Sequence, residues 1–138
     1  MYIKSYMIFL LFLFSIEVNS ADLKVTVNGV GSSDGIVVVA LFSEEESDLF
    51  PEEEPERVMI TDAENGSVTV IFTSIPAGEY AIAAFHDKNN NGELDKSGIG
   101  LPEEPYGNTG IRSARKPLYE NSKFEFSEDE KQLTIEIE

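Results

Sequence analysis

The 138-residue chain contains no cysteine, no tryptophan and one histidine. Without cysteine it cannot form disulfide bonds, carry a lipid on an N-terminal cysteine or use a thiol as a nucleophile. A domain without disulfides depends on its hydrophobic core or on a bound metal. The chain is long enough for a core, since a domain of this size buries about two thirds of its unfolded surface. A metal would therefore add to stability without being its sole source.

Basic residues are also scarce. Ten Lys and Arg stand against 26 Asp and Glu, which gives a formal net charge of −16. Such a chain repels phosphate backbones and anionic lipid surfaces, which argues against binding to nucleic acids or to anionic membranes. Metal cations, basic partners and plain solubility remain as reasons for the charge. Most of the acidic side chains are expected to form a solvated surface.

The beginning of the chain has the pattern of a secretory signal peptide. Lys4 precedes an apolar run over residues 7–14, and Val18 and Ser20 stand at the minus-three and minus-one positions of a cleavage site. The apolar run is too short for a membrane span, which needs about 20 residues. An uncleaved anchor is the alternative interpretation.

This pattern divides the chain into two parts. Residues 1–20 are predicted to be a signal peptide, cleaved after Ser20, and residues 21–138 to form one mature domain. The mature domain is predicted to contain no membrane span and to be secreted or periplasmic.

The mature chain has the hydrophobic pattern of short β-strands. Leu23, Val25 and Val27 alternate with polar residues, and residues 36–42 form a continuous apolar run, as in a strand buried on both faces. Further predicted strands cover residues 57–61, 67–72, 80–86, 123–126 and 133–137. About seven strands without an amphipathic helix predict an all-β fold, an antiparallel β-sandwich of Ig-like or prealbumin-like type. The first two strands are expected to pair as a hairpin across the turn at 29–35.

An acidic segment, residues 43–55, separates the second and third predicted strands. Ser43 is followed three residues later by Glu46, the signature of a capped helical turn. We therefore expect a long acidic loop that begins with one helical turn. Phe50 is expected to anchor this loop at the edge of the core.

Residues 87–95 carry the most informative pattern. Asp87, Asn89 and Asn91 place oxygen-bearing side chains at every second position, and Asp95 closes the run. This is the spacing with which a loop wraps a hard cation such as Ca²⁺, with a glycine at the sharp turn and a backbone carbonyl among the ligands. The sequence therefore predicts a Ca²⁺ site formed by Asp87, Asn89, Asn91, Glu93 (through its carbonyl) and Asp95.

The same residue types also form turns without any metal, so a plain turn is the alternative. The loop is not an EF-hand, because Gly98 occupies the twelfth position, where an EF-hand has a bidentate Glu. A further ligand would have to come from outside the run, and Glu103 and Glu104 are the nearest candidates.

The chain also resembles a known family. The resemblance is carried by Ile75 to Ile82, by Phe85-His86-Asp87 with the loop over 89–95, and by the segment 100–107 with its Pro-Glu-Glu-Pro-Tyr-Gly turn. These segments are similar to the uncharacterised bacterial secreted family called domain of unknown function 2141. The turn and strand over 75–82 also resemble transthyretin-like and carboxypeptidase-regulatory-like sandwich modules. The resemblance implies a secreted or periplasmic β-sandwich of unassigned role, and it supplies no established catalytic residues to carry over.

Three other features are candidates for chemistry. His86 is expected to hydrogen-bond a loop carbonyl, with a ligand or catalytic role as the alternative; no Gly-x-Ser-x-Gly motif accompanies it. Tyr106 is expected to cover the core or to line a shallow groove. Glu103 and Glu104 could form an acid pair for glycoside cleavage, but adjacent carboxylates on a loop are usually solvated. A basic cluster follows, made of Arg112, Arg115 and Lys116, and is expected to neutralise the acidic loop or to hold an anion.

Together these patterns favour a non-enzymatic, exported β-sandwich with a Ca²⁺-stabilised loop and an unknown protein or glycan partner at the cell envelope. The alternative is a carbohydrate- or peptide-binding accessory module that uses Tyr106 and has no functional metal. A hydrolase built on His86 is a third and weaker interpretation.

Overall fold

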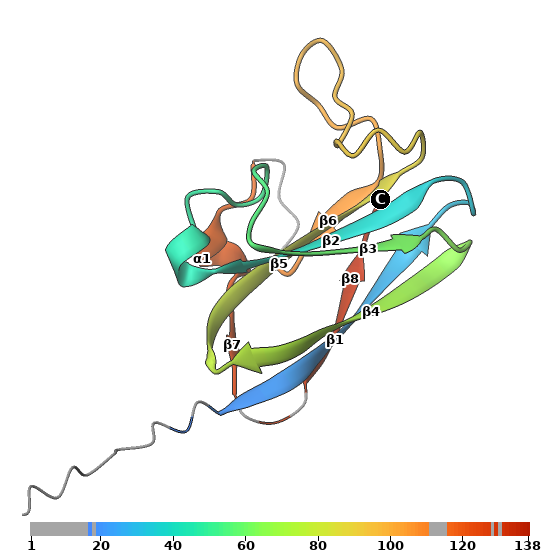
Figure 1. Ribbon diagram of the computed structural model, residues 1–138. Helices are drawn as coiled ribbons and strands as arrows, with labels where there is room; N and C mark the ends of the chain where they lie inside the picture. The colour runs from blue at the N-terminus through green and yellow to red at the C-terminus, as the bar shows by residue number, and fades with distance from the viewer. Residues whose placement is uncertain (1–16, 18, 111–115, 128, 130) are drawn as a thin grey trace, which may run out of the picture.

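The structure is a computed structural model that describes residues 17, 19–110, 116–127, 129 and 131–138 (Figure 1). Residues 1–16 and 18, which make up most of the predicted signal peptide, lie outside the described residues, and so do Arg112 and Arg115. Within the described part, no helix is long and apolar enough to cross a membrane.

Most of the described chain is β-strand, which confirms the all-β prediction. The strands are β1 (Ser20–Val30), β2 (Ile36–Ser43), β3 (Arg57–Asp62), β4 (Gly66–Pro76), β5 (Gly78–Asp87), β6 (Tyr106–Asn108), β7 (Phe124–Phe126) and β8 (Lys131–Glu136). Two short helical segments accompany them, the 3₁₀ turn η1 (Glu44–Glu46) and the four-residue helix α1 (Tyr119–Ser122).

The strands form two sheets that pack face to face (Figure 1). Sheet A has the strand order β4-β1-β8, and sheet B has the order β3-β2-β5-β6, with β7 also paired to β5. β1 and β8 run parallel, whereas the other pairs are antiparallel. The predicted β-sandwich is therefore confirmed, with one parallel pair in place of a fully antiparallel arrangement.

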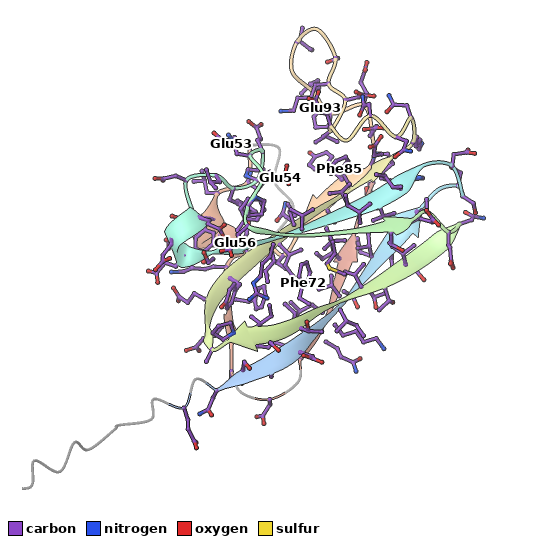
Figure 2. The ribbon with its side chains drawn as sticks, viewed as in Figure 1. Glu53, Glu54, Glu56, Phe72, Phe85 and Glu93 are labelled. Carbon is purple, nitrogen blue, oxygen red and sulfur yellow. The ribbon has the colours of Figure 1, made fainter. Side chains whose placement is uncertain are left out.

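The main core fills the space between the sheets. Successive side chains of a strand point to opposite faces, so alternate residues such as Val25 of β1, Val39 of β2 and Ile82 of β5 point inward and are fully buried. Phe72 of β4 also lies between the sheets, as Figure 2 shows. Burying a side chain of this kind stabilises the fold by about 1.5–3 kcal/mol.

The predicted hairpin between the first two strands is wrong. β1 belongs to sheet A and β2 to sheet B, so the turn at 31–35 carries the chain from one layer to the other. The buried faces of the two strands then meet across the core. Alternation along each strand is the same whether its neighbour lies in the same sheet or in the facing one, and the sequence pattern could not separate the two.

The expectations for the acidic segment are confirmed. Ser43 donates from its backbone N–H and its hydroxyl to Glu46 Oε2, at 3.0 and 2.9 Å, and η1 begins there. Phe50 is 5% exposed, and its ring contacts Phe42 and Tyr119 with centroids 5.1 and 6.2 Å apart. These three rings and Ala81 form a second apolar cluster, on the outer face of sheet B. The acidic loop and α1 thus cover one end of that face.

Candidate functional site

The predicted metal-binding segment lies in a long loop between β5 and β6, which stands beyond the end of sheet B (Figure 1). The loop closes on itself near its tip, where Lys96 and Pro102 form a bridge and Gly100 N–H donates to the Ser97 carbonyl at 2.8 Å. The loop ends where β6 begins, at Tyr106, and the sequence analysis predicted no strand there. A three-residue strand with a central glycine has no alternation that could have revealed it.

Asp87 organises the first turn of this loop. It is 0% exposed at the end of β5, and its carboxylate accepts the backbone N–H groups of Asn91 and Gly92 at 3.2 and 2.7 Å. Gly92 adopts φ +80°, a conformation that glycine takes without strain. The chain therefore wraps around the Asp87 carboxylate, which accepts two backbone N–H groups of the loop.

The side chains of Asn89, Asn91 and Asp95 are brought together. The Asn89 and Asn91 amide nitrogens donate to the two Asp95 carboxylate oxygens at 2.5 and 2.8 Å. The amide oxygens of Asn89 and Asn91 accept the backbone N–H groups of Asn91 and Glu93, at 3.2 and 2.9 Å. Glu93 itself is exposed (Figure 2).

Glu104 holds both ends of the segment. It is 8% exposed, and its two carboxylate oxygens accept the N–H of Lys88 at 2.9 Å and the N–H of Asp95 at 3.1 Å. Glu103 is exposed and contributes only a backbone contact, its N–H donating to the Asp95 carbonyl at 2.8 Å. Of the two residues considered from the sequence, Glu104 is therefore the one that meets the loop. The expectation that both carboxylates are solvated is therefore confirmed for Glu103 and wrong for Glu104, which is buried.

In the described part of the chain, no basic side chain forms an ion pair with the buried carboxylates of this loop. Within the described residues, none of the ion pairs involves Asp87, Asp95 or Glu104. Two of these carboxylates are buried, and backbone N–H groups are their hydrogen-bond donors. Burying an anion without a cation is unfavourable, so the loop is a place where a cation would be stabilising.

The residues fit Ca²⁺ in chemical type, since carboxylate, amide and carbonyl oxygens are its usual ligands. They do not form a ready-made cage. No group of three or more His, Cys, Asp or Glu side chains in the described part of the chain is placed to hold a metal ion. The Asn89 and Asn91 amides also present N–H groups, not oxygens, to Asp95. Both amides would have to present their oxygens for a metal to bind.

His86 is a structural brace, as expected from the sequence. It is 0% exposed, and its Nε2 lies 2.7 Å from the carbonyl oxygen of Asp34, to which it donates. Nδ1 is buried and has no hydrogen-bond partner among the described residues. Next to this contact, a Cβ placed on Gly35 would lie 2.0 Å from the Asp87 carbonyl oxygen. The turn before β2 thus packs tightly against the start of the loop, a contact for which the sequence carried no signal.

Tyr106 lines a cavity of about 390 Å³, so the groove that the sequence suggested is present. The cavity lies where β6 and β7 of sheet B face β8 of sheet A, and its walls are mixed. Phe124 and Leu133 supply apolar surface, and Asn108 and Thr134 supply polar groups.

Lys116 neutralises part of the acidic loop, as predicted. Its Nζ lies 3.3 Å from Glu52 Oε2, and Lys96 Nζ lies 3.0 Å from Glu52 Oε1. Hydrogen bonds from Lys96 and Lys116 lower the pKa of the Glu52 carboxyl. The Lys96 contact, which the sequence did not suggest, ties the long loop to the acidic loop.

Comparison with known proteins identifies a family. The model of a family described as an uncharacterised protein conserved in bacteria, domain of unknown function 2141, matches residues 25–134. No curated protein and no solved structure matches the chain.

Proposed function

The chain belongs to this uncharacterised bacterial family, and on that premise we propose that it is an exported, non-enzymatic β-sandwich whose loop over residues 87–95 binds one Ca²⁺. The loop, ordered by the ion, presents its surface to a protein or glycan partner at the cell envelope. Export is supported by the signal-peptide pattern over residues 1–20.

The observation that carries the calcium proposal is a pair of buried carboxylates, Asp87 and Glu104, whose hydrogen-bond donors among the described residues are backbone N–H groups and not basic side chains. A divalent cation would offset this negative charge. The carboxylates of Asp87 and Asp95, the amide oxygens of Asn89 and Asn91 and the carbonyl of Glu93 would hold it. Glu104 supports the loop from behind through its hydrogen bonds to Lys88 and Asp95.

The expected affinity is modest because the set contains two carboxylates and two amides. Extracellular modules commonly bind Ca²⁺ with a Kd of about 10⁻⁴–10⁻³ M. With a Kd of about 10⁻⁴ M and about 1 mM calcium, binding adds about 1.4 kcal/mol to the free energy of unfolding. An increment of this size orders a loop, whereas the hydrophobic core decides whether the domain folds.

The test is a calcium-dependent melting experiment on the mature chain, residues 21–138. Calcium at about 1 mM should raise Tm by about 3–8 °C relative to chelator. Asp87→Ala should abolish the difference, and Asp62→Ala, which removes an exposed carboxylate from β3, should leave it unchanged. Equal melting of the unmodified protein with calcium and with chelator contradicts the proposal.

The environment of His86 supports a non-enzymatic role. The ring is fully buried, and its Nε2–H is engaged by the Asp34 carbonyl, so neither ring nitrogen faces a substrate in solution. A hydrolytic activity that disappears in His86→Ala but survives in a control of equal stability would contradict this part of the proposal.

A second candidate function is a carbohydrate- or peptide-binding accessory module with no functional metal. The cavity lined by Tyr106 and Phe124 favours it, because a cavity with both apolar and polar walls is a common binding arrangement. A glycan or peptide that binds equally well in calcium and in chelator, and that is lost in Tyr106→Ala, would distinguish this function from the calcium-dependent one.

A further inference from the structure

The outer face of sheet B carries apolar residues that pack in neither core. Ile60 pairs with Val38, Val38 with Phe85, and Phe85 with Tyr106, so the four residues form one row across β3, β2, β5 and β6. Directly paired residues of antiparallel strands point to the same side of the sheet. Ala84 and Gly107, which also pair, belong to the inner face, because Ala84 lies in the main core. The row therefore lies on the outer face, and we call it the outer row.

The two ends of the outer face of sheet B differ, because other side chains cover one end and leave the outer row at the other end partly exposed. At the covered end, Phe50 and Tyr119 cover Phe42 and Ala81. None of the four outer-row residues belongs to a buried cluster, and Ile60 is 61% exposed. Val38, Phe85 and Tyr106 are half-buried, so the row offers a partly exposed apolar strip on which a partner could dock.

Carboxylates lie on the same side of sheet B as the outer row. Figure 2 shows Phe85 on the same side of sheet B as Glu53, Glu54 and Glu93, with Phe72 on the opposite side, between the sheets. The three glutamates are exposed, and two of them stand on the acidic loop and one on the long loop. The lysine that joins these two loops, Lys96, is engaged by Glu52. The outer face of sheet B therefore combines the apolar outer row with exposed glutamates on the two neighbouring loops.

We propose that the outer row, with Glu53, Glu54 and Glu93 on the same side of sheet B, is the docking face for an extended basic segment of another protein, in which apolar residues alternate with Lys or Arg. Apolar side chains of that segment cover Ile60, Val38 and Phe85, and its cations reach the glutamates. A second copy of this chain is disfavoured as the occupant, because two chains of net charge −16 repel each other. This proposal names the partner chemistry of the envelope interaction proposed above, but it does not require bound calcium.

The test measures binding of a fluorescein-labelled hexapeptide of alternating Lys and Leu to the exported protein by fluorescence anisotropy. We expect saturable binding that weakens several-fold between about 50 and 500 mM NaCl, since exposed charges are screened. Peptides of alternating Glu and Leu, or of alternating Lys and Ser, should bind at least about tenfold more weakly, because each lacks one half of the complementarity. Equal binding of all three peptides, or no binding of the first, overturns the proposal.

Matched variants locate the site. Ile60→Lys should weaken the binding at least about tenfold, whereas Ile71→Lys should not; both are exposed isoleucines on edge strands, Ile71 on β4 of sheet A. Glu54→Lys should weaken it several-fold, and Asp129→Lys, between β7 and β8, should not. Because Ile60 is so exposed, its replacement tests the face without removing a core side chain. Equal effects of the two isoleucine variants, or a dimer that Ile60→Lys dissociates, contradict the proposal.

Running the same binding in calcium and in chelator separates this inference from the calcium loop. Peptide binding that survives chelator, with no effect of calcium on melting, supports the docking face and contradicts the calcium proposal. Calcium-dependent melting without peptide binding supports the calcium proposal and contradicts the docking face.

Discussion

Two acidic loops flank the outer face of sheet B, and they are held in different ways. The loop over residues 44–56 buries Phe50 against other aromatic rings and pairs Glu52 with two lysines. The loop over residues 88–105 leaves Ile99 83% exposed and is ordered by hydrogen bonds from its own backbone to Asp87 and Glu104.

This difference shows what a loop's anchor decides about its chemistry. A loop that is anchored by an apolar side chain can keep its carboxylates in water, where the free-energy cost of each charge is small. A loop that is ordered by buried carboxylates concentrates negative charge in a place that water reaches poorly, and a bound cation stabilises it most. For this reason we propose the cation site in the second loop and not in the more acidic first one.

The largest expected effect tests the apolar anchor of the first loop. Phe50→Ala should lower the free energy of unfolding by about 3–5 kcal/mol, because it removes a buried ring that contacts Phe42 and Tyr119. Urea unfolding followed by circular dichroism measures this. Leu49→Ala, at the half-buried neighbouring position, should cost clearly less. A loss below about 1 kcal/mol for Phe50→Ala would show that the acidic loop is not anchored by this ring.

The second effect tests the buried carboxylate of the long loop. Glu104→Gln keeps the size of the side chain but replaces one acceptor oxygen by a donor that faces a backbone N–H, which should cost about 1–3 kcal/mol. Glu103→Gln, at an exposed position, should change stability by less than about 0.5 kcal/mol. Thermal unfolding measures the stabilities of the two variants. Equal stabilities would refute the role assigned to Glu104.

A smaller effect tests the turn around Asp87. Gly92→Ala should cost about 1–2 kcal/mol, since Gly92 has φ +80° and a side chain is strained there although the space is open. Gly98→Ala is the matched control in the same loop, because its φ is ordinary and its Cβ would also meet open space. It should be neutral or stabilising by about 0.4–1 kcal/mol. Hydrogen exchange at the Asn91 and Gly92 amides should become faster in Gly92→Ala alone.

The smallest effect concerns pH and the first loop. Partial burial raises the pKa of Glu46, but hydrogen bonds from the Glu56 and Ser43 N–H groups outweigh it, so the pKa lies below the ordinary value of 4.5. A lowered pKa in the folded state contributes stability above pH 4.5, and this contribution is lost as the pH falls through the folded pKa.

The Tm difference between the unmodified protein and Glu46→Gln should therefore be largest near pH 6 and shrink below pH 4.5. The stability difference near pH 6 should be about 1 kcal/mol. A difference that is the same at both pH values would exclude a charged role for Glu46.

Much of the fold followed from the sequence because local patterns report burial directly. The alternation of Val68, Val70 and Phe72 predicted a half-buried strand, and all three are buried in β4. The Ser43 and Glu46 spacing predicted a capped turn, since this contact lies within one helical turn. The residue types at 87, 89, 91 and 92 likewise predicted a tight turn or a cation-binding loop, and the chain does turn there, with Gly92 at φ +80°.

Contacts between distant segments were decided by the tertiary structure alone. Whether β1 pairs with β2 or faces it across the core depends on the packing of whole sheets, and the sequence pattern is the same in both cases. The choice of Glu104 over Glu103, the His86 contact to Asp34 and the outer row from Ile60 to Tyr106 likewise depend on sheet register. By itself the sequence determined which side chains are buried and which carry charge, because hydrophobicity and backbone preference are local properties. Which of these groups meet is a property of the folded sheets, whose contacts join residues far apart in the chain.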